Sequence, residues 1–342
     1  MHVLLLCLCV LLSAIPSLAA ASKGLGEAAA AIERQDYAAA HAALAPLAES
    51  GNAEAQYVLG RLYAAGQGCP QDESKAAALF RKAAVQGDPS AQNSLAMFLL
   101  QGRGVGKKTS EAASWFRKAA DQGLATAEYN LALLYAEGRG VAKNPQEAFK
   151  WQQRAASQGY APAQYVCGWM HLHGKGVQRS ETKALHWFQQ AADQGEARAW
   201  NELGSFYAQG LAVPQSYAKA LECYNKSADQ GYAPAQYNLG FLYEEGKGVK
   251  QDYGKAFEWY SKAASQGDAM AQYSLGVLYE DGLGRARNLE EARRWYRKAA
   301  NGGDKDAQIA LELLDNRGKG KASGANSTGK SGQKTKKRTK QN

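Results

Sequence analysis

A glycine recurs every 36 residues along most of this chain. The series is Gly51, Gly87, Gly123, Gly159, Gly195, Gly231, Gly267 and Gly303. Two alanine series keep the same interval, one from Ala55 to Ala307 and one from Ala76 to Ala292. A fixed period of roughly 20–50 residues is typical of solenoids, in which each repeat buries its apolar face by stacking on its neighbours. The period predicts seven repeats, at 52–87, 88–123, 124–159, 160–195, 196–231, 232–267 and 268–303.

Each repeat is expected to hold two helices. The segment AEAQYVLGRLY places Ala55, Leu59 and Leu62 on one side of a helix, because apolar residues three and four apart share a face. The segment DESKAAALFRKAAVQG does the same with Ala76 and Phe80. We call these helix A and helix B. The pattern predicts an all-α fold, a right-handed α/α superhelical solenoid of about seven helix-pair repeats.

The start of helix B is marked in most repeats by a side chain that can accept a hydrogen bond from a free amide of the first turn. These residues are Asp72, Asn144, Ser180, Ser216, Asp252 and Asn288. The end of helix B is marked by the periodic glycine, which can adopt the left-handed conformation of a helix C-terminus. We therefore expect helix B to be bounded at both ends by local sequence.

Two further glycine patterns are expected to be structural. Helix A carries one small residue per repeat, which predicts a close crossing with another helix; the residues are Gly60, Ala96, Ala132, Gly168, Gly204, Gly240 and Gly276. A Gly-x-Gly turn joins the two helices, as in Gly66 and Gly68, but repeat five has Gly210 and Ala212. Paired glycines before a helix also occur in phosphate-binding loops. Recurrence in nearly every repeat favours a backbone requirement.

The ends of the chain differ from its middle. Residues 1–21 hold an apolar run from Val3 to Leu12, then Pro16 and small residues near Ala19, which predicts a cleaved signal peptide and a secreted or periplasmic protein. The alternative is an uncleaved membrane anchor, because no Lys or Arg precedes the apolar run. Residues 22–51 are expected to form N-terminal capping helices, and residues 304–315 a lone C-terminal capping helix A.

Residues 316–342 form a basic tail that we expect to be disordered, because it has no apolar side chain larger than alanine. It contains nine Lys and Arg residues and no acid, and without them the cations of the chain equal its 32 acids. Such a tail could bind a polyanion such as a glycan, lipid head group or lipopolysaccharide through Lys334, Lys336, Lys337, Arg338 and Lys340. Nucleic acid is disfavoured for an exported protein. A tail that only solubilises is the alternative.

The repeat unit resembles a known family. The segment AEAQYVLGRLYAAGQG…DESKAAALFRKAAVQG, and the later copy APAQYNLGFLYEEGKGVKQDYGKAFEWYSKAASQG, are similar to the Sel-one-like repeat, a relative of the tetratricopeptide repeat. The resemblance covers about residues 36–315. It implies a right-handed superhelix with a concave surface for partners, and adaptor roles in the cell envelope or secretory route. Some cysteine-rich relatives carry β-lactamase labels, but this chain lacks their paired cysteines.

Two motifs of enzymes appear in settings that do not support the chemistry. Residues 324–331, GANSTGKS, match the phosphate-binding loop pattern, but that loop needs a preceding strand and a following helix. The S-x-x-K pattern of penicillin-recognising enzymes occurs at Ser180 and Ser216. Because Asp72 and Asp252 occupy the same repeat position, both serines are interpreted as N-caps. We expect no catalytic residue; a β-lactamase-like hydrolase is the third hypothesis.

Histidines and cysteines replace regular repeat residues. His171, His173 and His186 all fall in repeat four, which permits a metal or pH-sensitive site, although His171 also fits as a substitute for the periodic tyrosine. Cys69, Cys167 and Cys223 lie in three different repeats, so no disulfide framework is expected. We predict no metal and no cofactor.

Recognition must use positions that the period leaves variable. Trp169 and Phe241 follow the small residue of helix A, where no periodic core requirement calls for an aromatic, and are candidate anchors for a partner. Local packing explains them equally well. Asn130, Glu202 and Asn238 share a second variable position and could bond a peptide backbone. The sequence predicts a non-enzymatic interaction scaffold for a protein or peptide, with no small-molecule substrate.

Overall fold

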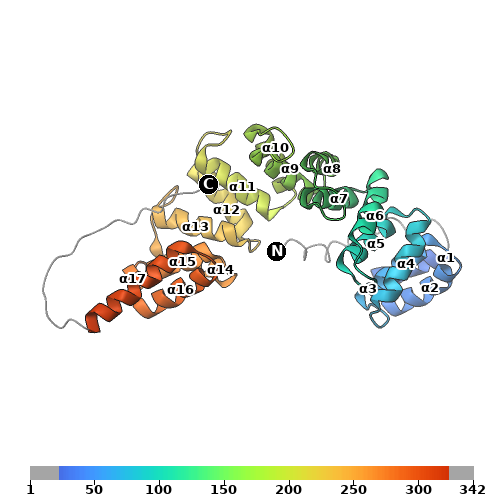
Figure 1. The fold of residues 1–342 in the computed structure, drawn as a ribbon, viewed down its shortest axis with the longest axis horizontal. Helices are drawn as coiled ribbons and strands as arrows, with labels where there is room; N and C mark the ends of the chain where they lie inside the picture. The colour runs from blue at the N-terminus through green and yellow to red at the C-terminus, as the bar shows by residue number, and fades with distance from the viewer. Residues whose placement is uncertain (1–22, 323–342) are drawn as a thin grey trace. The chain divides into compact units, whose positions relative to one another are not determined.

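The computed structural model describes residues 23–322, and every regular element in that part of the chain is an α-helix (Figure 1). The helices divide between two compact units, which we describe separately. Unit 1 contains α1 (Lys23–Glu33), α2 (Tyr37–Glu49), α3 (Ala53–Ala65), α4 (Glu73–Val85), α5 (Pro89–Gln101), α6 (Thr109–Asp121), α7 (Ala125–Glu137), α8 (Pro145–Ser157), α9 (Ala161–His173) and α10 (Glu181–Asp193). Unit 2 contains α11 (Ala197–Gln209), α12 (Tyr217–Ala228), α13 (Ala233–Glu245), α14 (Tyr253–Ser265), α15 (Ala269–Asp281), α16 (Leu289–Asn301) and α17 (Lys305–Ala322).

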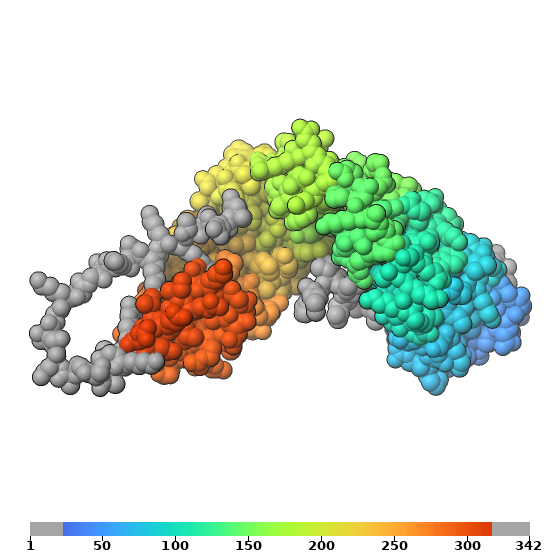
Figure 2. Space-filling model, viewed as in Figure 1, coloured from blue at the N-terminus to red at the C-terminus, as the bar shows by residue number. Residues whose placement is uncertain are grey.

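The helix-pair fold predicted from the period is confirmed. Odd-numbered helices from α3 to α15 are helices A, and even-numbered helices from α4 to α16 are helices B. Consecutive helices of each unit contact one another, and Figure 2 shows neighbouring parts of each unit packed together without gaps between them. Alanine and leucine fill the core, and Ala55, Leu95 and Ala112 are among the residues with 5% or less exposure. Burial of this apolar surface is the main force that holds the hairpins together.

The six predicted N-caps of helix B all accept a backbone amide bond. The carboxylate Oδ1 of Asp72 accepts from the amide of Lys75 at 2.9 Å, and the hydroxyls of Ser180 and Ser216 accept from Lys183 and Lys219 at 3.3 Å. The equivalent bonds form at Asn144, Asp252 and Asn288. In repeat two Lys108 stands at this position and makes no side-chain cap bond. The serines of the S-x-x-K pattern therefore serve as caps.

The small residue of helix A lies against an aromatic ring of helix B, as the sequence predicts. A β-carbon built on Gly240 would lie 2.5 Å from the Tyr260 ring, and one on Gly168 would lie 2.7 Å from the Phe188 ring. Both distances are far below a van der Waals contact. The glycine thus allows the two helices of one repeat to approach closely.

The Gly-x-Gly turn connects a repeat to the one before it. Gly140 has a φ of +72°, and a β-carbon there would lie 2.3 Å from the carbonyl oxygen of Thr109, in the first turn of α6. Gly104 stands in the same relation to Glu73 of α4. The second glycine of the turn is therefore required both by its conformation and by the stacking of repeats. Ala212, which replaces it in repeat five, adopts a φ of +55°.

A ladder of glutamines joins the hairpins, and it was not predicted; each pair combines a buried glutamine of helix A with an exposed one after helix B. The side-chain amide of Gln56 in α3 donates to the carbonyl of Ala48 at the end of α2, at 3.0 Å. The amide of Gln86, which follows α4, donates to the Gln56 carbonyl oxygen at 2.8 Å. The same arrangement recurs with Gln92 and Gln122, Gln164 and Gln194, and Gln236 and Gln266. Each of these carbonyls also accepts a backbone amide from the periodic glycine, as Ala48 does from Gly51, so the glutamine adds a second hydrogen bond at the helix end.

Repeats three and five replace the ladder glutamine of helix A, and repeat seven has Gly302 at the second ladder position. In repeat three Glu128 stands at the helix A position, is fully buried, and pairs with Arg154 at 2.9 Å. Burial raises the pKa of the Glu128 carboxyl, while Arg154 opposes that rise. In repeat five the position holds Trp200, and Cys223 takes the place of the tryptophan that most helices B carry. Repeat five thus carries its indole on helix A, whereas most repeats carry it on helix B.

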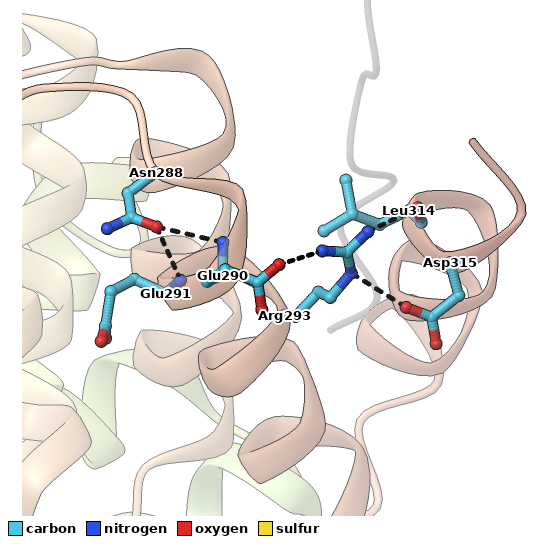
Figure 3. Close-up of polar contacts among 6 residues, drawn as sticks. All are labelled: Asn288, Glu290, Glu291, Arg293, Leu314 and Asp315. Carbon is cyan, nitrogen blue, oxygen red and sulfur yellow. Dashed lines mark hydrogen bonds and ion pairs between the residues drawn. The ribbon is translucent and has the colours of Figure 1, made fainter. Parts of the chain in front are cut away.

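The last helix packs on α16 through buried Ala307, Ala310 and Leu314, and one arginine adds polar bonds between the two helices (Figure 3). The Arg293 guanidinium on α16 donates to the Asp315 carboxylate at 3.0 Å and to the Leu314 carbonyl at 3.3 Å, both on α17. It also pairs with Glu290 at 2.5 Å on its own helix. Contrary to the predicted end at residue 315, α17 continues to Ala322. A helix that has already formed gains a backbone hydrogen bond with each added residue, which favours this extension.

Between residues 23 and 322, no helix has the length and apolar character needed to cross a bilayer. The predicted signal peptide and most of the basic tail lie outside the described residues. Lys334, Lys336, Lys337, Arg338 and Lys340 and the GANSTGKS motif belong to that part.

Candidate functional site

The five residues predicted to bind a partner fall in different units. Asn130 and Trp169 lie on α7 and α9 of unit 1, and Glu202, Asn238 and Phe241 lie on α11 and α13 of unit 2. All five are on helices A. The structure thus divides them into two sets, one in each unit.

In unit 1, variable positions of three helices A form a surface of half-exposed side chains. We call it the α5–α7–α9 surface and define it by Asn93, Met97, Asn130, Leu133, Val166 and Trp169. Met97 packs on a core cluster that includes residues of α7, while Leu133 and Val166 pack on a second cluster shared by α7 and α9. These shared clusters place the three helices next to one another. Trp169 is 38% exposed, an unusual value for so large an apolar side chain.

A hydrogen bond between two asparagines links α5 to α7 on this surface. The Asn130 side-chain amide donates to the Asn93 carbonyl oxygen at 3.0 Å. Asn130 was predicted to bond a peptide backbone, and this bond uses only one of its amide hydrogens. An asparagine side chain has two donors and an acceptor, so the pair keeps further hydrogen-bonding capacity.

The Trp169 ring is supported on one side by His173. Their ring centroids lie 4.4 Å apart at an interplanar angle of 26°, and a His173 ring nitrogen lies 2.9 Å from the Trp169 carbonyl oxygen. This stack holds the indole in one orientation. An aromatic side chain that is already ordered loses little entropy when a partner covers it, which is a property of interface anchors.

Charge distinguishes the α5–α7–α9 surface from the rest of unit 1. Helices α5 and α9 contain no Asp, Glu, Lys or Arg, and α7 contains only Glu137 and the buried Glu128. The helices B between them carry both signs of charge, for example Glu111 and Lys118 on α6. The α5–α7–α9 surface is therefore suited to an uncharged, largely apolar segment.

The residues of unit 2 lie in a more polar and charged setting. The Phe241 ring is partly buried, and the Lys247 ammonium lies 4.6 Å from its centroid. The Asn238 amide donates to Asn201 at 2.9 Å, and the Asn201 amide lies 3.5 Å from a Glu202 carboxylate oxygen. The three predicted residues are thus part of local networks within α11 and α13. Of the two sets, that of unit 1 has the more exposed aromatic.

Two buried tyrosines of helix B reach carboxylates of helix A in unit 2. The Tyr260 hydroxyl donates to Glu244 at 2.5 Å, and the Tyr296 hydroxyl donates to Glu280 at 2.8 Å. Burial and the adjacent carboxylate both raise the pKa of each tyrosine. The tyrosines remain neutral donors, so these pairs act as structural hydrogen bonds within the hairpin.

The three histidines of repeat four are not brought together into a ligand set. His171 is 3% exposed, contacts the Phe149 ring edge-on, and has one ring nitrogen 3.3 Å from the Gln178 carbonyl oxygen. Burial lowers the pKa of His171. His186 lies against Trp187 instead. Among the described residues, no three His, Cys, Asp or Glu side chains are grouped to hold a metal ion.

The cysteines occupy core positions as expected from their repeat register. Cys167 and Cys223 are buried, and burial raises the pKa of their thiols to about 12 and about 11. A thiol with so high a pKa is a poor nucleophile at neutral pH. Both residues are therefore explained by packing.

Sequence reasoning missed two asparagines of helices A, the half-buried Asn93 and the buried Asn201. Each replaces the tyrosine that most repeats carry at this position of helix A. Each bonds an asparagine 37 positions later, Asn130 or Asn238. Loss of a periodic tyrosine together with a nearby asparagine in the next repeat was the available signal.

Comparisons with known proteins agree on the repeat. The Sel1 repeat model matches residues 53–88, 89–124, 125–160, 161–196, 197–232, 233–268 and 269–304. The chain is similar to the crystal structure of c5321, a protective antigen of uropathogenic Escherichia coli strains with an SLR fold, at 35% identity and a TM-score of 0.73. That match covers 85% of this chain and 65% of the other, so the chain spans less than two thirds of that protein.

A second solved structure, a Sel1 repeat protein from Oxalobacter formigenes, is 34% identical with a TM-score of 0.66. This match covers 71% of the chain described here and 96% of the other chain. A search of curated proteins finds no match.

Proposed function

Since this chain belongs to the Sel1 repeat family, we propose that it is an exported, non-enzymatic scaffold that holds a protein partner on the α5–α7–α9 surface. The observation that carries the proposal is the contrast between helices A and helices B of unit 1. The helices A named α5, α7 and α9 combine half-exposed Met97, Leu133 and Trp169 with almost no charge, while the helices B between them are charged. Apolar surface that remains partly open is characteristic of interaction sites.

The expected ligand is an apolar segment of a protein. Trp169 would act as the central anchor, because a rigid aromatic contributes most of the binding energy in many interfaces. Asn130 and Asn93 would bond the backbone of the bound segment with their remaining donors and acceptors. Specificity would then come from the pattern of apolar side chains, with little contribution from charge.

Export is part of the proposal, and it rests on the composition of residues 1–21. The relative from uropathogenic Escherichia coli is described as a protective antigen. Export would place this chain outside the cytoplasm. The same location would place the partner in the cell envelope or the secretory route.

A binding role also agrees with the chemistry of the hairpins. Ser180 and Ser216, the serines of the S-x-x-K pattern, have their hydroxyls committed to capping α10 and α12. Cys167 and Cys223 are buried with raised thiol pKa values. These groups support a structural role and give no support to a hydrolase.

The test is site-specific photo-cross-linking in the cells that make the protein. A photoreactive amino acid is placed at Leu133 on the α5–α7–α9 surface and, as a matched control, at Lys150 on the exposed side of α8. We expect one defined protein to be captured from Leu133, with the Trp169→Ala variant reducing capture at least about tenfold. Equal capture from both positions, or capture unaffected by Trp169→Ala, would refute the site.

A further inference from the structure

An open hollow lies on the helix B side of the first repeat. It has a volume of about 560 Å³ and is lined by Gln56, Ala78, Arg81, Lys82, Val85 and Gln86. Val85 is 71% exposed, more than any other large apolar side chain of the described chain. The hydrogen bond from Gln86 to Gln56 fixes two of the lining side chains. The hollow thus has an apolar lining on a helix face that normally contacts water.

The other repeats show that this apolar lining is not required by the fold. The position of Ala78 is occupied elsewhere by Ser114, Lys150, His186, Glu222, Glu258 and Arg294. The position of Val85 is occupied by Asp121, Ser157, Asp193, Asp229, Ser265 and Asn301. All twelve residues are polar. Repeat one therefore has two apolar replacements at solvent-facing positions, and both border the same hollow.

Most other repeats place an indole beneath the cation that corresponds to Lys82. The ammonium of Lys118 lies 4.1 Å from the Trp115 ring, that of Lys262 lies 3.8 Å from the Trp259 ring, and that of Lys298 lies 4.1 Å from the Trp295 ring. The Arg154 guanidinium lies 4.4 Å from the Trp151 ring. A cation over an indole face is attracted by the ring quadrupole. The pairing recurs, so the repeat favours an aromatic ring under this cation.

Repeat five forms the same cation–indole pair, but its tryptophan stands on helix A, at the repeat position of Gln56, which lines the hollow of repeat one. Its helix B has Cys223 in place of the tryptophan, and the Trp200 ring on helix A lies 4.0 Å from the Lys226 ammonium. Trp200 occupies the repeat position of Gln56, and Lys226 occupies that of Lys82. In repeat five, an indole at the first of these two positions therefore lies against the cation at the second, and both positions line the hollow in repeat one.

Repeat one has neither indole. Leu79 stands at the tryptophan position of helix B, and Gln56 stands at the position of Trp200. We propose that the hollow of repeat one receives a tryptophan side chain from a protein partner, which lies beneath the Lys82 ammonium and against Val85 and Ala78. The partner residue completes the cation–indole pair that repeats two, three, five, six and seven form internally.

The charge of the hollow predicts which residues flank the partner's tryptophan in its own sequence. Arg81 and Lys82 line the hollow, and no carboxylate does. Arg81 already pairs with Glu111 at 2.8 Å, so Lys82 is the cation that faces the added ring. A carboxylate next to the tryptophan would be drawn to the Lys82 ammonium. The bound segment is therefore a tryptophan flanked by an acidic residue.

This contact is separate from the α5–α7–α9 surface. It lies on α3 and α4, and it involves helix B, whereas the proposed function uses helices A. It rests on the proposed function only in that the partner is a protein. Variants of Trp169 test the first proposal, and variants of Leu79 and Val85 test the second, so failure of one leaves the other intact.

The experiment follows methyl resonances of Val85 and Ala78 in the full-length protein during titration with the peptide acetyl-Glu-Trp-Glu-amide. We expect saturable shifts caused by the indole ring current, with a Kd on the order of 1 mM for so small a ligand. The peptide acetyl-Glu-Ala-Glu-amide should cause none. Absence of saturable shifts with the tryptophan peptide would overturn the proposal.

Two variants locate the contact. Leu79→Trp gives repeat one its own indole, as in repeats two, three, four, six and seven, and should weaken peptide binding at least about tenfold without lowering the melting temperature. Val85→Asp copies Asp121, Asp193 and Asp229 and should weaken binding similarly. The matched control Asp121→Asn, at the same position of repeat two, should leave binding unchanged. Binding that survives both Leu79→Trp and Val85→Asp would contradict the assignment.

A second copy of the chain is the competing occupant, because Trp169 is exposed. Sedimentation of the protein without peptide distinguishes the two. A monomer at the concentrations of the titration supports a partner's tryptophan. Self-association that is abolished equally by Trp169→Ala and by Leu79→Trp would overturn the proposal in favour of a contact between copies.

Discussion

Substitution of Gly140 by alanine tests how one repeat is stacked on the next. Gly140 has a φ of +72°, and its added β-carbon would lie 2.3 Å from the Thr109 carbonyl oxygen of the preceding repeat. Gly159 is the matched control: its φ is +83°, and a β-carbon there meets no atom within 4 Å. Both substitutions strain the backbone, but only Gly140→Ala displaces the neighbouring hairpin.

The expected losses in the free energy of unfolding follow from the backbone strain and from the displacement of the neighbouring hairpin. A left-handed conformation costs a non-glycine residue about 1–2 kcal/mol, and the loss of chain entropy in the unfolded state returns about 0.4–1 kcal/mol. Gly159→Ala should therefore lower the free energy of unfolding by about 1 kcal/mol. Gly140→Ala adds an overpacking cost of about 1–3 kcal/mol because a backbone oxygen cannot move aside. We expect a total loss of about 3 kcal/mol.

Urea unfolding followed by tryptophan fluorescence measures the difference. With a denaturant slope of about 2 kcal/mol per molar, the unfolding midpoint of Gly140→Ala should lie about 1 M below that of Gly159→Ala. Equal midpoints for the two variants would refute the reasoning, since they would show that the second glycine of the turn is needed for its conformation alone.

Three further predictions concern single residues. Arg293→Ala removes the bonds to Leu314 and Asp315 and should speed amide exchange in α17 by about tenfold or more, whereas Arg294→Ala, whose pair with Glu291 is exposed, should leave it unchanged. Burial lowers the pKa of His171, so protonation favours the unfolded state; the urea midpoint should fall as pH drops below about 6.5, and less so in His171→Tyr. Ala212→Gly relieves a φ of +55° and should raise the free energy of unfolding by about 0.5 kcal/mol in urea titrations.

The sequence predicted the helices because their signals are local and repeated. The N-cap side chains of Asp72, Ser180 and Asn288 form the expected bonds with amides two or three residues ahead. Helix boundaries of this kind need no knowledge of distant contacts. The end of α17 was placed too early, at residue 315, because the glycine-containing segment that follows gives no apolar pattern.

The glutamine ladder could have been found but was overlooked. Gln56 and Gln92 recur at the same interval as the glycines, and so do Gln86 and Gln122. Periodic polar residues in an apolar helix indicate a buried hydrogen bond that each repeat must make. The shared departure of Trp200 and Cys223 in repeat five was a similar signal, since two changes in one hairpin exchanged the position of an indole.

The two proposed binding surfaces depend on contacts between repeats, which cannot be read from the sequence. The bond between Asn93 and Asn130 requires that two different repeat positions meet across neighbouring helices. The exposure of Trp169 and of Val85 likewise depends on how neighbouring hairpins cover each helix. The candidate anchors Trp169 and Phe241 were named from sequence, but only the structure separates an exposed ring from one covered by Lys247.

The central claim is that recognition uses helices A of unit 1. Hydrogen exchange measured on the protein alone and bound to the partner identified by cross-linking tests it most directly. The account predicts slower amide exchange in α5, α7 and α9 on binding, with α6, α8 and α10 little changed. Protection confined to helices B, or to residues 323–342, would contradict the account.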